Sequence, residues 1–140
     1  MGTTVNSKNL VIHDLKINLQ IWDFVGDEMF RPLLFNYARG AFGGLFIYDI
    51  SNKESLSNID SWFSLFRDKE SDNQILIPII FAWNKSDLAS ERKVNHEDAL
   101  NASKSYNILE YFECSAKTNE NIEILFITLT NEIMKRSNFI

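Results

Sequence analysis

Three short polar segments follow apolar runs that predict β-strands, and their residue types suit ligand binding. They are Trp22–Glu28 (WDFVGDE), Asn84–Asp87 (NKSD) and Ser115–Lys117 (SAK). In sheets of the doubly wound α/β class, ligands bind beyond the carboxyl ends of the strands. Acidic, amide and cationic side chains at these ends can hydrogen-bond a polar ligand. Alone, the NKSD segment is equally typical of a polar turn that bonds its own backbone. Three such segments in this order favour ligand binding.

Hydrophobic periodicity predicts the strands that must position these segments. Residues 15–22 alternate apolar and polar side chains, and residues 5–12 predict a partner strand across a turn at His13-Asp14. Almost wholly apolar runs at 45–50 and 75–83 are typical of parallel strands covered by helices on both faces. Pro78 suits its strand only near the start. A short strand is predicted at 111–114.

Helices are predicted between these strands, which indicates a doubly wound α/β fold. Ser51 and Glu54 have the spacing of a capping box at the start of the first helix. Asn95 is expected to cap a second helix that runs to about Tyr106. The C-terminal helix carries one apolar stripe and two basic residues in its last turn. The stripe consists of Ile122, Leu125, Phe126, Leu129 and Ile133.

Composition indicates one globular domain and excludes several classes of function. The chain has 140 residues, of which 45% are hydrophobic and 24% charged. A net charge of −5 argues against binding to nucleic acid. We find no apolar run of the roughly 20 residues that span a bilayer, and no secretion signal or lipidation site. The lone cysteine, Cys114, is expected to be buried and without chemistry, and it favours the reducing cytoplasm. His13 and His96 are expected in solvent.

The order of the three segments resembles that of the Ras-like small GTPases. WDFVGDE is followed by Phe30-Arg31 and by Tyr37–Ala41, a Tyr-x-Arg-Gly-Ala run that looks most like the Rab branch. The resemblance covers essentially the whole chain, so residues 1–140 are interpreted as one partial G domain. It implies a Ras-like P-loop GTPase fold, which is α/β with a mostly parallel sheet and helices on both faces.

The resemblance assigns guanine recognition to the NKSD loop. Asp87 would accept two hydrogen bonds, from the ring N–H and the exocyclic amine of guanine. Adenine lacks that amine and has an acceptor at the ring nitrogen. Asn84 would tie the base loop together, while the stem of Lys85 would cover one face of the base.

The resemblance also assigns roles at the other two loops. The backbone N–H of Ala116 would donate to the guanine carbonyl, in a loop shaped by Ser115 and Lys117. Asp23 would hold Mg²⁺ indirectly through water, and Gly26 would sense the γ-phosphate. The implied ligands are therefore GTP or GDP with Mg²⁺.

The largest departure from the family is the absence of a Gly-x-x-x-x-Gly-Lys-[Ser/Thr] sequence, the loop that holds the phosphates. Alignment places Gly2 just after the family's switch threonine, so the first strand, the phosphate loop and the first helix would be missing. Because that strand is central in the family's sheet, we expect unpaired strand edges and marginal stability. Base contacts alone should bind nucleotide weakly, at about millimolar affinity at best.

A second departure is Asp27, which stands where the family has its water-orienting Gln. Asp cannot donate to the γ-phosphate and repels it, so GTP hydrolysis should be slow in a longer form, and this chain alone is expected to be inactive. Phe24, Val25 and Trp83 add bulk where the family has smaller residues.

The sequence therefore predicts a small GTP-binding switch of Rab/Ras type, part of a longer GTPase that acts in signal transduction or vesicle trafficking. Residues 24–40 would present a surface to effectors, exchange factors or GTPase-activating proteins. The alternative is a pseudo-GTPase, a protein-interaction module that keeps the fold without binding nucleotide productively. Both guanine-reading loops favour the switch, whereas loss of the phosphate loop favours the alternative. A third interpretation is a split protein whose phosphate loop comes from another chain.

Overall fold

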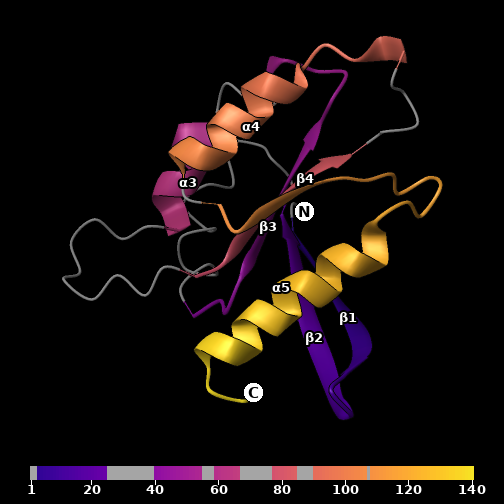
Figure 1. Cartoon of the computed structure of the whole chain (residues 1–140), viewed down its shortest axis with the longest axis vertical. Coiled ribbons are helices and arrows are strands. Elements are labelled where there is room, and N and C mark those ends of the chain that lie inside the picture. The colour runs from indigo at the N-terminus through magenta and orange to yellow at the C-terminus, as the bar shows by residue number, and fades with distance from the viewer. Residues whose placement is uncertain (1–2, 25–39, 55–58, 67–76, 85–89, 107) are drawn as a thin grey trace. The chain divides into compact units, whose positions relative to one another are not determined.

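The computed structural model describes residues 3–24, 40–54, 59–66, 77–84, 90–106 and 108–140 (Figure 1). The chain divides into two compact units, Met1–Ala41 and Phe42–Ile140. Each unit has its own β-sheet.

The first unit contains an antiparallel hairpin of β1 (Thr3–Ile12) and β2 (Leu15–Phe24). Ile12 pairs with Leu15, which leaves His13 and Asp14 as a two-residue turn. Both turn residues have positive φ, 50° and 62°. A type I′ turn requires this, and its twist matches that of the strands. The predicted strands and turn are confirmed, and each strand is two residues longer than predicted.

The second unit contains a parallel sheet with the strand order β3-β4-β5. The strands are β3 (Gly44–Asp49), β4 (Ile79–Asn84) and β5 (Glu110–Glu113). The helices are α3 (Ile59–Phe66), α4 (His96–Ser105) and α5 (Ile122–Arg136). Strands alternate with helices along the chain, as predicted for the α/β class. Within the described ranges, no helix is long and apolar enough to cross a bilayer.

Side chains of β4 alternate between two layers of helices. Ile80 and Ala82 pack against α5, whereas Phe81 and Trp83 pack toward α3 and α4. Figure 1 shows α5 on one face of this sheet and α3 and α4 on the other. The prediction of helices on both faces is therefore confirmed, and it explains why β4 is apolar from Ile79 to Trp83, up to its last residue.

Two helix predictions are also confirmed. Asn95 caps α4, since its side-chain oxygen accepts a hydrogen bond from the N–H of Glu97 at 3.1 Å, and Tyr106 follows the last helical residue. The predicted stripe of α5 faces the sheet, with Leu125 and Leu129 buried and its other members partly buried. The last turn of α5 carries the two basic residues, Lys135 and Arg136.

The predicted strand at 75–83 was too long at its start. β4 begins at Ile79, directly after Pro78, and residues 75 and 76 lie outside the described part. Proline has no N–H to donate to a ladder. The carbonyl of Pro78 instead accepts a hydrogen bond from the N–H of Gly44 at 3.0 Å. The β3–β4 pairing therefore starts at Gly44 and Ile79, directly after the proline.

The predicted capping box at Ser51 was wrong. The hydroxyl of Ser51 donates to the carboxylate of Asp49 at 2.6 Å. The side chain of Asn52 accepts instead from the N–H of Glu54 at 3.0 Å. Asn is as good a capping residue as Ser, and the nearby carboxylate occupies the serine hydroxyl.

Candidate functional site

Two of the predicted polar segments leave the second unit's sheet from neighbouring strand ends. β4 ends at Asn84 and β5 at Glu113, and Trp83 pairs with Glu113 in the parallel ladder. The N–H of Cys114 donates to the carbonyl of Trp83 at 2.7 Å, which extends this pairing by one residue. The NKSD and SAK segments therefore begin at the same carboxyl edge, where ligands bind in this fold class.

A hydrogen bond joins the two segments. The backbone N–H of Ala116 donates to Oδ1 of Asn84 at 3.2 Å, across 32 positions of sequence. The side chain of Asn84 thus ties the SAK loop to the end of β4. A guanine carbonyl that bonded to the Ala116 N–H, as the family resemblance implies, would replace Asn84 Oδ1 as its acceptor.

Ser115 holds the SAK loop from the inside. It is completely buried, its N–H donates to the carbonyl of Glu120 at 3.1 Å, and its hydroxyl accepts from the N–H of Thr118 at 3.2 Å. Lys117 is exposed on the same loop. Ser115 and Lys117 therefore lie in a short, internally bonded loop beside Asn84.

Two asparagines that our sequence reasoning missed close this loop. Asn119 and Asn121 have φ of 62° and 57°, in the left-handed region that Asn adopts more readily than most residues. The side chain of Asn121 donates to the carbonyl of Glu113 at 2.8 Å, which joins the two ends of the loop. The Asn-Glu-Asn sequence at 119–121 could have signalled this turn.

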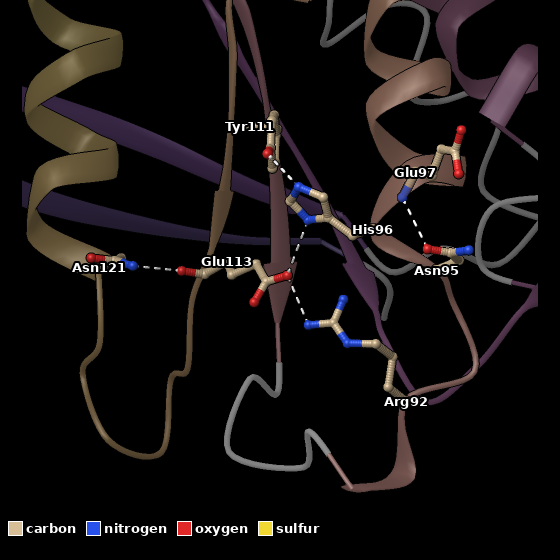
Figure 2. Close-up of polar contacts among 7 residues, drawn as sticks. All are labelled: Arg92, Asn95, His96, Glu97, Tyr111, Glu113 and Asn121. Carbon is tan, nitrogen blue, oxygen red and sulfur yellow. Dashed lines mark hydrogen bonds and ion pairs between the residues drawn. The ribbon is translucent and has the colours of Figure 1, made fainter.

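A polar cluster that the sequence did not predict surrounds the side chain of Glu113 (Figure 2). Arg92 donates through Nη2 to Oε1 of Glu113 at 2.7 Å. Nδ1 of His96 lies 3.7 Å from the same oxygen, and Nε2 of His96 lies 2.9 Å from the hydroxyl of Tyr111. His96 is exposed, as expected, but it has specific partners.

Trp83 and Tyr48 form the buried side of this cluster. The guanidinium carbon of Arg92 lies 5.5 Å from the centre of a ring of Trp83, and Trp83 is completely buried. The Tyr48 hydroxyl and Trp83 Nε1 are both buried and lack a hydrogen-bond partner in the described part of the chain. Burial raises the pKa of Tyr48, and the carboxylate of Glu113 raises this pKa further.

Cys114 is buried, as predicted, and directly follows the last residue of β5. Burial raises the pKa of its thiol, and the negative charge of Glu120 adds to the effect. A buried thiol with a raised pKa is a poor nucleophile. That Cys114 has no chemical role stays a prediction.

Of the remaining predicted site residues, the structure describes only Asp23. Asp23 is exposed near the end of β2, where it pairs with Thr4 across the hairpin. No group of three or more His, Cys, Asp or Glu side chains that could hold a metal occurs among the described residues. Four predicted site residues lie outside the described ranges, as do residues 25–39 of the predicted partner-binding segment. The four are Gly26, Asp27, Lys85 and Asp87.

Comparison with known proteins identifies the family. The chain matches the model of the Ras family over residues 1–135. It is 35% identical over 136 residues to the Ras-related protein Rab-26 of Bos taurus. This alignment covers 97% of this chain and 52% of that protein. It is 36% identical over 138 residues to the human Ras-related protein Rab-3D. This alignment covers 99% of this chain and 61% of that protein.

The chain belongs to the Ras family. Its relatives make it Rab-like, which confirms the resemblance that its motifs carry. The chain spans about half to three fifths of the length of these relatives.

Proposed function

We propose that the chain forms the guanine-binding part of a Rab-like, nucleotide-dependent switch. The observation that carries this proposal is the hydrogen bond between Ala116 and Asn84. It joins two loops whose residue types suit recognition of one base. Asp87 would supply the carboxylate that bonds the ring N–H and the adjacent amine of guanine. This pairing would reject adenine, which has an acceptor at that ring nitrogen and no amine at the adjacent carbon C2.

GTP or GDP with Mg²⁺ are the proposed ligands. Lys85 would cover the base, and Ser115 and Lys117 would hold the loop that faces it. Asp23 would bind Mg²⁺ through water, and Gly26 would contact the γ-phosphate.

We assign phosphate binding to sequence beyond these 140 residues, because the chain has no phosphate-loop motif and its relatives are longer. Sequencing the transcript upstream of Met1 tests this assignment. An in-frame phosphate loop supports it, and an in-frame stop codon contradicts it.

Residues 24–40 would form the segment that partners recognise when the γ-phosphate orders it. Those partners would be effectors, exchange factors and GTPase-activating proteins. The switch would act in the cytoplasm and take part in vesicle trafficking. Hydrolysis would be slow in the longer protein, because the carboxylate of Asp27 repels the γ-phosphate.

The test is a titration of the chain with GDP and with ADP, followed by NMR at the amide of Ala116. We expect a saturable shift with GDP at roughly millimolar concentration and none with ADP. Asp87→Asn should abolish the response to GDP and produce one to xanthosine diphosphate, which carries a carbonyl in place of the guanine amine. A chain that responds equally to GDP and ADP would contradict guanine recognition.

The second candidate function is a pseudo-GTPase, an interaction module without productive nucleotide binding. The missing phosphate-loop motif favours it for the chain by itself. The pseudo-GTPase would be supported over the switch if neither this chain nor a version joined to an upstream phosphate loop responded to GDP.

A further inference from the structure

We propose that Arg92 is a positioning residue that holds the SAK loop against Asn84. This inference rests on the proposed function, since it concerns the same guanine site. Arg92 follows β4 in the sequence, and Glu113 is the last residue of β5 before the SAK loop. The ion pair between them therefore links the chain beyond β4 to the start of that loop.

The geometry gives the Arg92 side chain two partners. Its Nη2 lies 2.7 Å from Oε1 of Glu113, and the two side chains are only 26% and 34% exposed. A charge-assisted pair that is partly withdrawn from water is screened less than a fully exposed one. Its guanidinium also lies over the ring of Trp83, at a distance suited to a cation–π contact. Because Trp83 is completely buried, its ring is a fixed surface for the guanidinium.

The backbone beside Arg92 is anchored to the sheet. The N–H groups of Lys93 and Val94 both donate to the carbonyl of Ile50, at 2.8 and 3.1 Å. Ile50 directly follows β3 and is completely buried. The main chain directly after Arg92 is thus anchored to the sheet, while the side chain of Arg92 contacts Glu113 and Trp83.

Glu113 transmits this restraint to the loop. Its side chain bonds to Arg92, while its carbonyl accepts a hydrogen bond from the side chain of Asn121 at the far end of the loop. Between these points the N–H of Ser115 bonds to the carbonyl of Glu120. A shift of Glu113 would therefore move the whole loop and turn the N–H of Ala116 away from Asn84.

Figure 2 shows His96 on another side of the same carboxylate. Nδ1 of His96 lies 3.7 Å from Oε1 of Glu113, close enough to approach that oxygen when Arg92 is removed. The test therefore includes Arg92→Gln both alone and combined with His96→Gln.

The experiment measures amide hydrogen exchange by NMR in the 140-residue chain without nucleotide. In Arg92→Gln, the amides of Ala116 and Thr118 should exchange about tenfold faster, the effect of losing a hydrogen bond to a charged group. The amide of Phe81, in the middle of β4, should be unchanged. Arg92→Lys should give an intermediate rate, because lysine keeps the charge but lacks the planar fork.

Arg136→Gln is the matched control. It removes an ion pair of nearly the same length, 2.8 Å to Glu132, from the last turn of α5. Its Ala116 and Thr118 amides should exchange as in the unaltered chain. Equal acceleration in Arg136→Gln and Arg92→Gln would overturn the proposal.

Two further results would also overturn it. One is an unchanged Ala116 rate in both Arg92→Gln and the double variant. The other is a uniform loss of protection in Arg92→Gln and Arg92→Lys, which would make Arg92 a general stabilising residue. A GDP titration separates this inference from the proposed function. If the unaltered chain binds no GDP but Arg92→Gln still frees the Ala116 amide, the positioning role stands and guanine binding fails.

Discussion

Tyr48 and Trp83 lie opposite each other on β3 and β4, with ring centroids 5.1 Å apart, and each has a buried polar atom without a partner in the described part of the chain. An unpaired buried donor is unfavourable, because it has lost its hydrogen bonds to water. The packing of the rings compensates for this loss. The hydroxyl of Tyr48 therefore adds nothing to the free energy of unfolding beyond what the aromatic ring contributes.

Tyr48→Phe should accordingly raise the free energy of unfolding by about 1 kcal/mol. Chemical denaturation monitored by circular dichroism measures this change. The control is Tyr111→Phe, which removes a hydroxyl that is bonded to His96 and should lower the free energy of unfolding by a similar amount. A Tyr48→Phe variant that is as destabilised as Tyr111→Phe would show that the Tyr48 hydroxyl has a partner.

The raised pKa of Tyr48 predicts a loss of stability in alkali. Burial keeps this hydroxyl protonated in the folded chain, whereas it ionises in the unfolded chain above its ordinary pKa of about 10. The titration of Tyr48 therefore does not change the free energy of unfolding below about pH 10. Above that pH it lowers this free energy by about 1.4 kcal/mol per pH unit. The difference in unfolding free energy between Tyr48→Phe and the unaltered chain should widen between about pH 10 and 11. A constant difference over this range would contradict the expectation.

Gly43 packs closely against α5, and Gly43→Ala should be destabilising. An added Cβ would lie 2.8 Å from Cδ1 of Ile133 and 3.1 Å from Cδ1 of Leu129. Because these atoms end flexible side chains that can shift, the unfolding free energy should fall by about 1 kcal/mol, the low end of the usual range for overpacking. The matched control is Gly44→Ala, whose added Cβ meets only Cγ1 of Ile79 at an ordinary 3.6 Å. Thermal unfolding compares the two variants.

Ile133→Val provides the rescue, because it removes the Cδ1 atom with the shortest contact to the new methyl group. The double variant Gly43→Ala/Ile133→Val should be more stable than the sum of the two single effects implies. Strict additivity would mean that the methyl group does not meet Ile133.

Asp27→Gln should accelerate GTP hydrolysis in a version of the protein joined to a phosphate loop. An amide can orient the attacking water without repelling the γ-phosphate, and a gain of about tenfold or more is expected. Single-turnover hydrolysis measures the rate, with Asp27→Asn as a control that removes the charge but keeps the shorter side chain. A rate in Asp27→Gln no higher than that of the unaltered protein would contradict the role given to this position.

Local patterns in the sequence predicted the elements whose structure depends on near neighbours. The alternation in residues 15–22 and the stripe on α5 are such patterns, and both elements formed as expected. The error at Ser51 arose from a carboxylate two residues earlier, which no capping pattern includes. The late start of β4 follows from Pro78, whose effect on the strand boundary was underestimated.

Contacts between distant residues were less predictable. The motifs selected Asn84 and Ala116 separately, and only the parallel register of β4 and β5 brings them within hydrogen-bonding distance. Arg92 and Glu113 are 21 positions apart, and neither belongs to a motif. Their pairing depends on where the chain returns to the sheet after β4, which periodicity does not encode.

The position of Cys114 makes the chain suitable for thiol-labelling kinetics. It is the sole cysteine, it is buried, and it lies between the residue that bonds Arg92 and the first residue of the SAK loop. A thiol reagent can reach it only when this region opens, so the rate of modification reports how often opening occurs. The rate of thiol modification at this natural cysteine therefore measures opening at this edge of the sheet, without any engineered probe.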